Sequence, residues 1–520
     1  MYKSYNRGDS WRRISPDLST NDPKKLNQET SGGLTADNSS AENHCTIYTV
    51  NESPLDSLII WAGTDDGNLQ VTTDGGKTWN NVVHNIPGLP QSTWCSYVEP
   101  GRFDRNTVYV TFDGHRLGDK TPYIFTSKDL GRTWKALADT SIKSYCQVIK
   151  EDLVNPDLLF LGTETGLYIS LNNGKDWAHF SGNLPHVPIM DMTIHPRDHS
   201  LVLATHGRGI MLIDDLTPLR MLSDEILNAD LKFLNTKDYI IRDETPGQGW
   251  NGDDEYSGEM TREAAQIVYF QKKRHVFGEM YIEIYDKENK MIQRLPAGTR
   301  KGINVVYWTI RMKPPRVPAS PQMEGSSMIG PNFPAGEYTV KLHKGTQVFD
   351  TRIRLAFNPA SGHLVADQET RQNALMKAYH LMETLAWLDR VAISVRDTAK
   401  QRSNGVSKSL IRKLHEAETR MDSLHEKMVV VREGKVVGDE RLREKIGFIY
   451  GSVMSYKGKP TDSQQNGLAA LAKEVDKINS QISAFKEHEL PELNQILLKT
   501  GKKEITMITE EDFLKKKEGK

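Results

Sequence analysis

Short apolar runs separated by polar and Gly-rich turns recur over residues 46–213, and they come in repeated sets. One set has apolar runs at 46–50, 58–63, 68–71 and 78–83, which predict four short strands. Two similar sets follow at 96–137 and about 147–180, and three runs at 190–194, 201–205 and 210–213 predict an incomplete last set. Repeated four-stranded units of this length are typical of β-propeller blades.

An eight-residue motif, Ser/Thr-x-Asp-x-Gly-x-Thr-Trp, recurs within these sets. It stands at 72–79 and 127–134, with degraded copies at 4–11 and 170–177. Asp and Gly favour a tight turn, the hydroxyls can bond its backbone, and Trp anchors the outgoing strand. We interpret the motif as the turn between the third and fourth strands of a blade, and predict structural roles for Asp74, Gly76, Trp79, Asp129, Gly131 and Trp134.

The number of motif copies and strand sets indicates the number of blades. Three full sets, one incomplete set and an opening hairpin make about four blades, a partial propeller over residues 1–215. One interpretation is that the opening hairpin and the incomplete set complement each other in a small closed ring. The other is that this region is the second half of a larger propeller, whose first half or an oligomer mate would be a partner.

Two further regions follow a connector at 216–264. About seven short alternating strands over 265–360 predict an immunoglobulin-like β-sandwich, with a long exposed loop at 314–334. From 361 to 520 the apolar period becomes about 3.5, which predicts a bundle of about four helices. The predicted seams are 410–428, 442–456 and 468–485, the last behind a capping box at Thr461 and Gln464.

Composition excludes several classes of function. Sixty-seven Lys and Arg against 68 Asp and Glu give a formal net charge of -1, so nothing favours nucleic acid as a partner. No apolar run is long enough for a transmembrane segment, and no signal peptide precedes the first motif. The three cysteines, Cys45, Cys95 and Cys146, have no metal-ligand spacing, so we predict buried thiols, no metal and no cofactor.

Candidate ligand-binding residues lie in the turns between the second and third strands. These turns open on the side of a propeller opposite the motif, where loops converge near the central channel. The carboxylates are equally compatible with ordinary hairpin chemistry, whereas His and Arg are not demanded by turn geometry. The candidates are Asp65, Asp66, Asp113, His115, Arg116, Glu164, His206 and Arg208.

A family resemblance rests on four short segments. They are SGGLT at 31–35, WAGTDDG at 61–67, FDGHR at 112–116 and THGRGI at 205–210. With the repeated motif, they resemble the bacterial sortilin-like proteins, which carry Asp-box (bacterial neuraminidase, BNR) repeats and are often labelled glycosyl hydrolases. The resemblance implies a longer exported protein, secreted, periplasmic or on the cell surface, of which this chain resembles the C-terminal portion.

Two functions are compatible with this pattern. The first is a non-catalytic binding or scaffold protein that holds a glycan or a peptide at the charged mouth of the propeller. The alternative is a glycoside hydrolase acting on an extracellular polysaccharide, which needs two carboxylates across the scissile bond. The Phe/Tyr-Arg-Ile-Pro signature of neuraminidases is absent, and no spacing identifies a catalytic pair.

Overall fold

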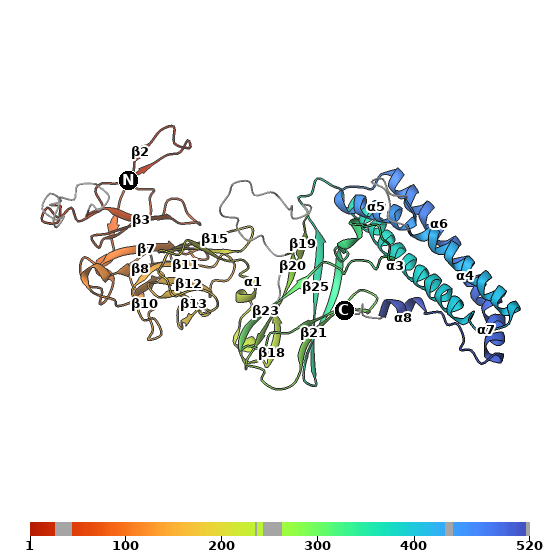
Figure 1. Ribbon diagram of the computed structural model, residues 1–520. Coiled ribbons are helices and arrows are strands. Elements are labelled where there is room, and N and C mark those ends of the chain that lie inside the picture. Colours follow the sequence, from red (N-terminus) through yellow and green to blue (C-terminus); the bar gives the residue numbers. More distant parts are fainter. Residues whose placement is uncertain (27–43, 235–236, 243–262, 432–439, 516–520) are drawn as a thin grey trace, which may run out of the picture. The chain divides into compact units, whose positions relative to one another are not determined.

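The computed structural model describes residues 1–26, 44–234, 237–242, 263–431 and 440–515 (Figure 1). Two compact units divide the chain. The first contains Met1–Lys237, Val268–Arg274 and Arg300–Asn304, and the second Asp238–Ile267, His275–Thr299 and Val305–Lys520. The segment at 31–35 lies outside the described residues, and the boundaries at 215, 264 and 360 stay predictions.

The first unit contains antiparallel sheets whose strands follow one another in chain order. Sequential strands that are also neighbours form the meander of a β-propeller blade, so the propeller prediction agrees with these sheets. The number of blades in a complete ring stays a prediction. The strands are β3 (Ile47–Glu52), β4 (Ile60–Thr64), β5 (Leu69–Thr72) and β6 (Asn80–Asn81); β7 (Trp94–Pro100), β8 (Val108–Asp113), β9 (Tyr123–Ser127) and β10 (Lys135–Ala136); β11 (Cys146–Glu151), β12 (Leu159–Thr163), β13 (Gly166–Ser170) and β14 (Ala178–His179); and β15 (Ile189–Ile194), β16 (Leu201–Thr205) and β17 (Ile210–Ile213).

The second strand of each full sheet is buried on both faces. Every residue of β4, β8 and β12 is buried, which explains why these strands are continuous apolar runs. Neighbouring sheets share cores: Trp61 and Val71 of one sheet cluster with Val110 and Phe112 of the next. Burial of these side chains between sheets is the main stabilising contribution in this unit.

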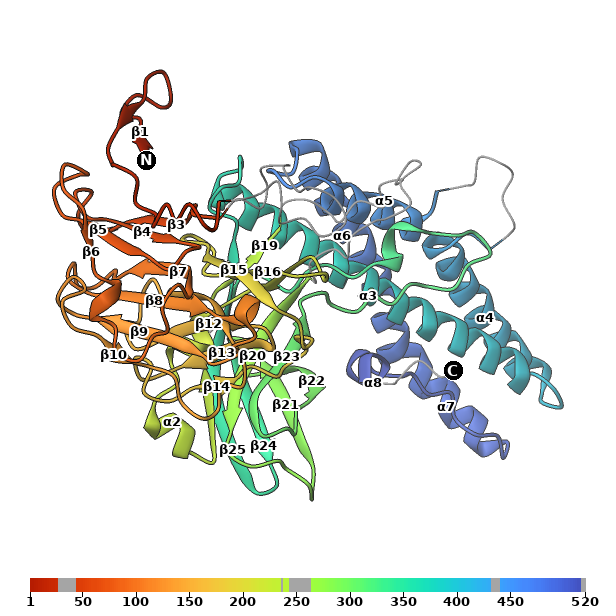
Figure 2. The same cartoon turned by 90° about the vertical axis from the view of Figure 1, so that its left-hand side faces the viewer.

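The opening hairpin pairs β1 (Tyr2–Lys3) with β2 (Arg12–Arg13), as predicted. Its loop carries the degraded motif at 4–11. Both views draw it projecting from the neighbouring sheet (Figures 1 and 2). Trp11 is 64% exposed, whereas Trp177, at the same motif position, is buried against the preceding sheet.

Two further β-sheets follow α1 (Thr217–Arg220) and α2 (Asp224–Asn228). Trp308 of one sheet contacts the other: the ring lies 5.0 Å from Tyr338, and Nε1 donates to Gln293 at 3.1 Å. That the two sheets form an immunoglobulin-like sandwich stays a prediction. The sheets are β18 (Leu231–Leu234), β20 (Ala264–Gln271) and β23 (Gly302–Thr309), and β19 (Tyr239–Ile241), β25 (Gln347–Phe357), β24 (Gly336–Lys344), β21 (Met280–Tyr285) and β22 (Met291–Pro296).

The C-terminal helices confirm most of the predicted seams. All six apolar positions of the 410–428 seam are buried, and so are all six of the 468–485 seam. Thr461 and Gln464 form the predicted capping box, whereas Tyr456, at the end of the middle seam, is exposed beyond its helix. The helices are α3 (Val365–Arg402), α4 (Lys408–Met428), α5 (Leu442–Ser455), α6 (Asp462–Ala484), α7 (Leu490–Lys499) and α8 (Glu510–Lys515), with a π-helical turn at Phe485–Glu489.

The segment 314–334 is not the freely exposed loop that its composition predicts. Two glycines on α5 allow it to pack closely, because a Cβ on Gly447 would lie 2.4 Å from Glu324 and one on Gly451 2.7 Å from Ser326. The hydroxyl of buried Tyr450 donates to the carbonyl of Ile329 at 2.7 Å. Met323 and Met328 remain exposed, so the prediction is correct for part of the segment only.

Candidate functional site

The repeated motif uses its polar atoms inside its own turn. Asp74 Oδ1 accepts from the backbone N–H groups of Lys77 and Thr78 at 2.9 and 3.0 Å, and Oδ2 accepts from the Thr78 hydroxyl at 2.7 Å. The Thr72 hydroxyl accepts from Gly76 N at 2.9 Å. These hydrogen bonds hold the pKa of Asp74 well below its usual range. The carboxylate is therefore engaged by the turn.

The glycine and tryptophan of the motif lie where one sheet meets the next. Gly76 has φ +96°, and a Cβ there would lie 2.4 Å from the Ile14 carbonyl oxygen, which also accepts from Trp79 Nε1 at 2.9 Å. Trp177 Nε1 donates to Leu137 O at 2.9 Å in the corresponding place. Trp134 differs, because it donates to Gly131 O in its own turn and its ring lies 6.4 Å from Trp61.

The turns that follow the second strands carry the candidate ligand-binding residues. Asp65 and Asp66 follow β4, Asp113 ends β8, Glu164 follows β12, and His206 follows β16. The structure therefore places the candidates at the same end of successive sheets, opposite the motif turns. They do not form a single cluster.

The two carboxylates after β4 are occupied by neighbouring backbone and hydroxyl groups. Buried Asp66 accepts from the backbone N–H and hydroxyl of Thr20, both at 2.6 Å, and from the hydroxyl of Thr64. Although burial raises the pKa of Asp66, these hydrogen bonds outweigh it, so the pKa is lowered. Asp65 accepts from Thr46 N at 2.7 Å and from Thr46 Oγ1 at 2.9 Å. Both residues tie segments of the chain together.

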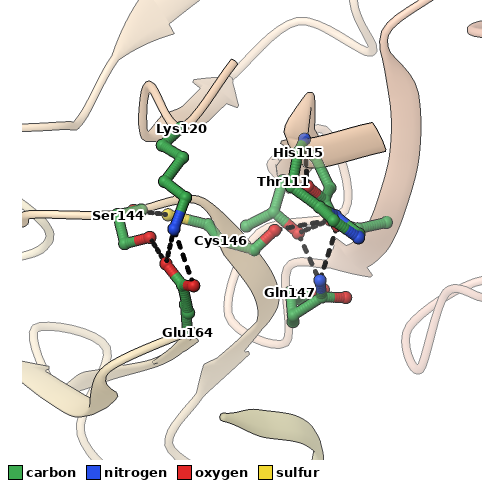
Figure 3. A network of polar contacts seen from close by, with 9 residues as sticks. Thr111, His115, Lys120, Ser144, Cys146, Gln147 and Glu164 are labelled. Atoms are coloured by element: carbon green, nitrogen blue, oxygen red, sulfur yellow. Dashed lines mark hydrogen bonds and ion pairs between the residues drawn. The ribbon is translucent and has the colours of Figure 1, made fainter. Parts of the chain in front are cut away.

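Asp113 and His115 form a closely spaced polar pair, and Figure 3 shows His115 beside Gln147. The side chain of Asp113 is fully buried, and its Oδ2 lies 2.6 Å from His115 Nδ1 and accepts from Gln147 Nε2 at 2.6 Å. Its Oδ1 accepts from His115 N at 2.8 Å. Because a carboxylate only accepts, Nδ1 carries the proton, and Nε2 of the half-exposed ring is left to act on a ligand.

Aromatic side chains surround this pair. The His115 ring stacks on Tyr145 at 4.6 Å and lies 6.4 Å from Trp94. The Arg116 guanidinium lies 4.3 Å from the Trp94 ring centroid, and Tyr48 meets Trp94 edge-on at 4.4 Å. Tyr48 is 49% exposed, so the group ends in an accessible aromatic ring.

Trp94 supplies an unused donor at this place. The residue is 8% exposed, and within the described part of the chain its buried Nε1–H has no hydrogen-bond acceptor. Buried N–H groups are nearly always paired, so an unpaired one indicates a water or a ligand atom. Arg116, His115 and Trp94 all come from the sheet of β7–β10: Arg116 and Trp94 offer donors, and His115 Nε2 offers an acceptor.

Strand alternation did not reveal Tyr48 and Gln147 because each lies at a β-bulge. The pairing of first with second strand shifts register at the same point in all four sheets. A bulge inserts one residue and redirects a side chain, and bulges are common next to binding sites. An aromatic residue near the start of the first strand in three of the sheets, Tyr48, Trp94 and Tyr145, was the available signal. The bulge residues are Tyr48, Ser96, Gln147 and Met190.

Glu164 belongs to a neighbouring polar group (Figure 3). Its Oε1 and Oε2 accept from Lys120 Nζ at 2.9 and 3.1 Å, and the Ser144 hydroxyl donates to Oε2. The Ser144 and Lys120 hydrogen bonds lower the pKa of Glu164. His206 and Arg208 are exposed after β16, and no contact recorded among the described residues joins them to His115.

Metal and thiol chemistry find little support in this geometry. The part of the chain that the structure describes contains no group of three His, Cys, Asp or Glu side chains placed to hold a metal ion. Cys95 and Cys146 are buried, and burial raises the pKa of both thiols. Cys45 is half-buried, so the prediction of buried thiols holds for two of the three.

Comparison with known proteins gives low similarities. No family model and no curated protein matches the chain. A GH74 enzyme from Niastella koreensis matches at 18% identity over 36% of this chain and 25% of its own, with TM-score 0.26. An ancestral GH74 enzyme matches at 15% identity over 67% and 41%, with TM-score 0.30, and YCF48 bound to D1 peptide at 18% over 36% and 75%, with TM-score 0.22.

This chain spans a quarter to two-fifths of the length of these two GH74 enzymes. TM-scores this low assign neither fold nor function, so the propeller assignment rests on the chain's own sheets. Among the described helices, none combines the length and the apolar character needed to cross a bilayer.

Proposed function

We propose that the mouth of the propeller binds a glycan or a peptide without cleaving it. The observation that carries this proposal is the His115 group: an imidazole oriented by buried Asp113 and stacked on Tyr145, beside Trp94 with its unpaired N–H. Rigid aromatic faces combined with a few oriented donors favour binding of sugar rings or of peptide side chains and carbonyls.

The state of the carboxylates argues against the alternative, glycoside hydrolysis. That reaction needs a general acid whose pKa is raised, facing a second carboxylate. The pKa values of Asp66 and Glu164 are instead lowered by hydrogen bonds. Asp65 and Asp113 both accept hydrogen bonds on their two oxygens.

The wider setting belongs to the same proposal. We place the chain with sortilin-like, Asp-box proteins outside the cytoplasm, on the strength of its repeated motif and of the segments at 61–67, 112–116 and 205–210. A separate propeller half or an oligomer mate remains the proposed protein partner. Asp74 and Asp129 are proposed to be structural, because their carboxylates are used by their own turns.

Glycan and peptide arrays test the binding proposal. We expect the full chain to retain a ligand, and His115→Ala/Arg116→Ala to lose it, because the double change removes the oriented imidazole and the guanidinium. Arg132→Ala/Lys175→Ala, which removes two exposed cations from the motif turns at the opposite end of the sheets, is the matched control and should bind as the wild type does. His206→Ala/Arg208→Ala tests whether the mouth extends to the last sheet.

Two results would contradict the assignment. Equal binding by wild type and His115→Ala/Arg116→Ala would mean that the ligand binds elsewhere on the protein. Release of reducing sugar from a polysaccharide panel, abolished by Asp65→Asn or Asp66→Asn, would favour the hydrolase.

A further inference from the structure

The loop between β20 and β21 presents two exposed apolar side chains. Val276 is 67% exposed and Phe277 87% exposed, the largest exposed fraction among the exposed apolar residues of the described chain. The loop is one continuous segment, 272–279, at one end of these strands (Figure 1). A large aromatic ring held in water at a loop tip is unfavourable unless another surface covers it.

The tip is held in place by its own backbone. His275 N donates to Thr299 O at 2.9 Å, which fastens the loop to the one preceding β23, and His275 Nε2 lies 3.2 Å from Gly278 O, across the tip. Gly278 has φ +86°, which produces the reversal after Phe277. A preformed tip loses little conformational entropy when a surface covers it.

Five cations lie in this loop and at the start of the neighbouring strand β23. Gln271 Nε2 reaches Arg300 O at 3.5 Å, so the end of β20 and the start of β23 carry their charges side by side. The acidic neighbours are Glu279, which pairs with Arg294, and Asp230. No ion pair recorded among the described residues engages any of the five cations, although Lys272 Nζ donates to Asn228 Oδ1 at 3.1 Å. The five cations are Lys272, Lys273, Arg274, Arg300 and Lys301, all exposed.

We propose that this loop, residues 272–279, docks on an anionic lipid bilayer. Phe277 and Val276 would enter the boundary between headgroups and acyl chains, while the five cations face lipid phosphates. Interfacial binding of this kind adds buried apolar area to attraction of roughly 1 kcal/mol per Lys or Arg near the surface. A soluble polyanion would use the cations and leave Phe277 in water, so the exposed ring favours the bilayer.

Flotation with vesicles tests this proposal, using the full chain and either phosphatidylcholine alone or phosphatidylcholine with phosphatidylglycerol. We expect binding to the anionic vesicles only. Lys273→Gln/Arg274→Gln should weaken it by about 25-fold, from roughly fivefold for each charge, and added salt should weaken it further. Phe277→Ser should weaken it on the order of tenfold, from the lost burial of one aromatic ring.

Matched controls are available on other exposed segments. Lys287→Gln/Lys290→Gln makes the same change of charge in the neighbouring turn, and Met323→Ser removes an exposed apolar side chain elsewhere; both should bind as the wild type does. Absence of binding to anionic vesicles, or equal binding by Phe277→Ser and wild type, would overturn the proposal. Loss of vesicle binding in Lys273→Gln/Arg274→Gln, with binding retained in Phe277→Ser, would instead identify a polyanion as the partner.

Discussion

At the scale of single residues, the aspartates have two different structural roles. Asp74 and Asp129 satisfy their oxygens within a turn, whereas Asp113 uses its oxygens to orient the imidazole of His115. The degraded motif at 170–177 has Asn172 in the first role, and its Oδ1 still accepts from Asp176 N at 3.0 Å. An amide side chain can therefore hold the same turn, so the turn does not require the negative charge of the motif aspartate.

The charge of Asp129 makes a pH-dependent contribution to stability. Hydrogen bonds from Thr133 lower the pKa of Asp129 from 3.8 to about 2. A lowered folded-state pKa stabilises the fold above the unfolded value, and this contribution is lost as pH falls through about 2. Thermal melting should thus find Asp129→Asn less stable than wild type near neutral pH, by a small amount because the side chain is only partly buried and water screens its charge. The difference should disappear between about pH 4 and pH 2; a constant difference across that range would contradict this account.

The sequence pattern predicted some of the residues at the proposed binding site and missed others. The repeat spacing correctly placed Asp113, His115 and Glu164 after second strands, because the motif counts strands from a fixed turn. Tyr48 and Gln147 were missed because a bulge shifts the alternation at the start of each first strand. Two of the hydrogen bonds that Asp66 accepts come from Thr20, 46 residues away, which no local pattern indicates.

At the scale of elements, close contacts between sheets depend on the motif glycines. Gly131 has φ +84°, and a Cβ there would lie 2.8 Å from Val82 Cγ2 in the preceding sheet. Gly118 has a similar φ of +78° with nothing within 4 Å of its would-be Cβ. Comparing the two positions therefore distinguishes the effect of backbone strain from the effect of packing between blades.

Replacing each glycine by alanine measures these two effects. Gly118→Ala should destabilise the fold by about 1 kcal/mol, from the left-handed backbone alone. Gly131→Ala should cost about 1–3 kcal/mol more, because the methyl group overlaps Val82. Denaturant unfolding of both variants provides the comparison, and equal losses would mean that the sheets separate easily at this contact.

The sequence pattern predicted the burial of the helices more accurately than it predicted the packing of the loops. Apolar seams with a period near 3.5 predict burial directly, whereas the Pro- and Gly-rich composition of 314–334 does not reveal its anchor on α5. Tyr450 is that anchor, through its bond to Ile329 O at 2.7 Å.

Removing the Tyr450 hydroxyl tests the anchor. Tyr450→Phe should lower the free energy of unfolding by about 1 kcal/mol, since the Ile329 carbonyl loses the hydroxyl donor of a buried residue. Tyr456→Phe changes an exposed ring by the same atom and should have little effect. Equal stability of Tyr450→Phe and wild type would indicate that segment 314–334 does not depend on this bond.

At the scale of the whole molecule, each part offers a different surface. The propeller sheets present the aromatic and His115 group at one end, and the 272–279 loop presents an apolar tip among cations. The helices bury their seams on one another, although Phe448 of α5 is 74% exposed. Both proposed binding surfaces lie in the strand-rich regions.

The most direct test of the binding account is equilibrium titration of the array-selected glycan or peptide, followed by mass analysis of the recovered ligand. We predict saturable binding to the wild type, loss of binding in His115→Ala, retention in Arg132→Ala, and a ligand recovered intact. A shortened ligand, produced by wild type and not by Asp113→Asn or Glu164→Gln, would contradict the account and identify the mouth as a hydrolytic site.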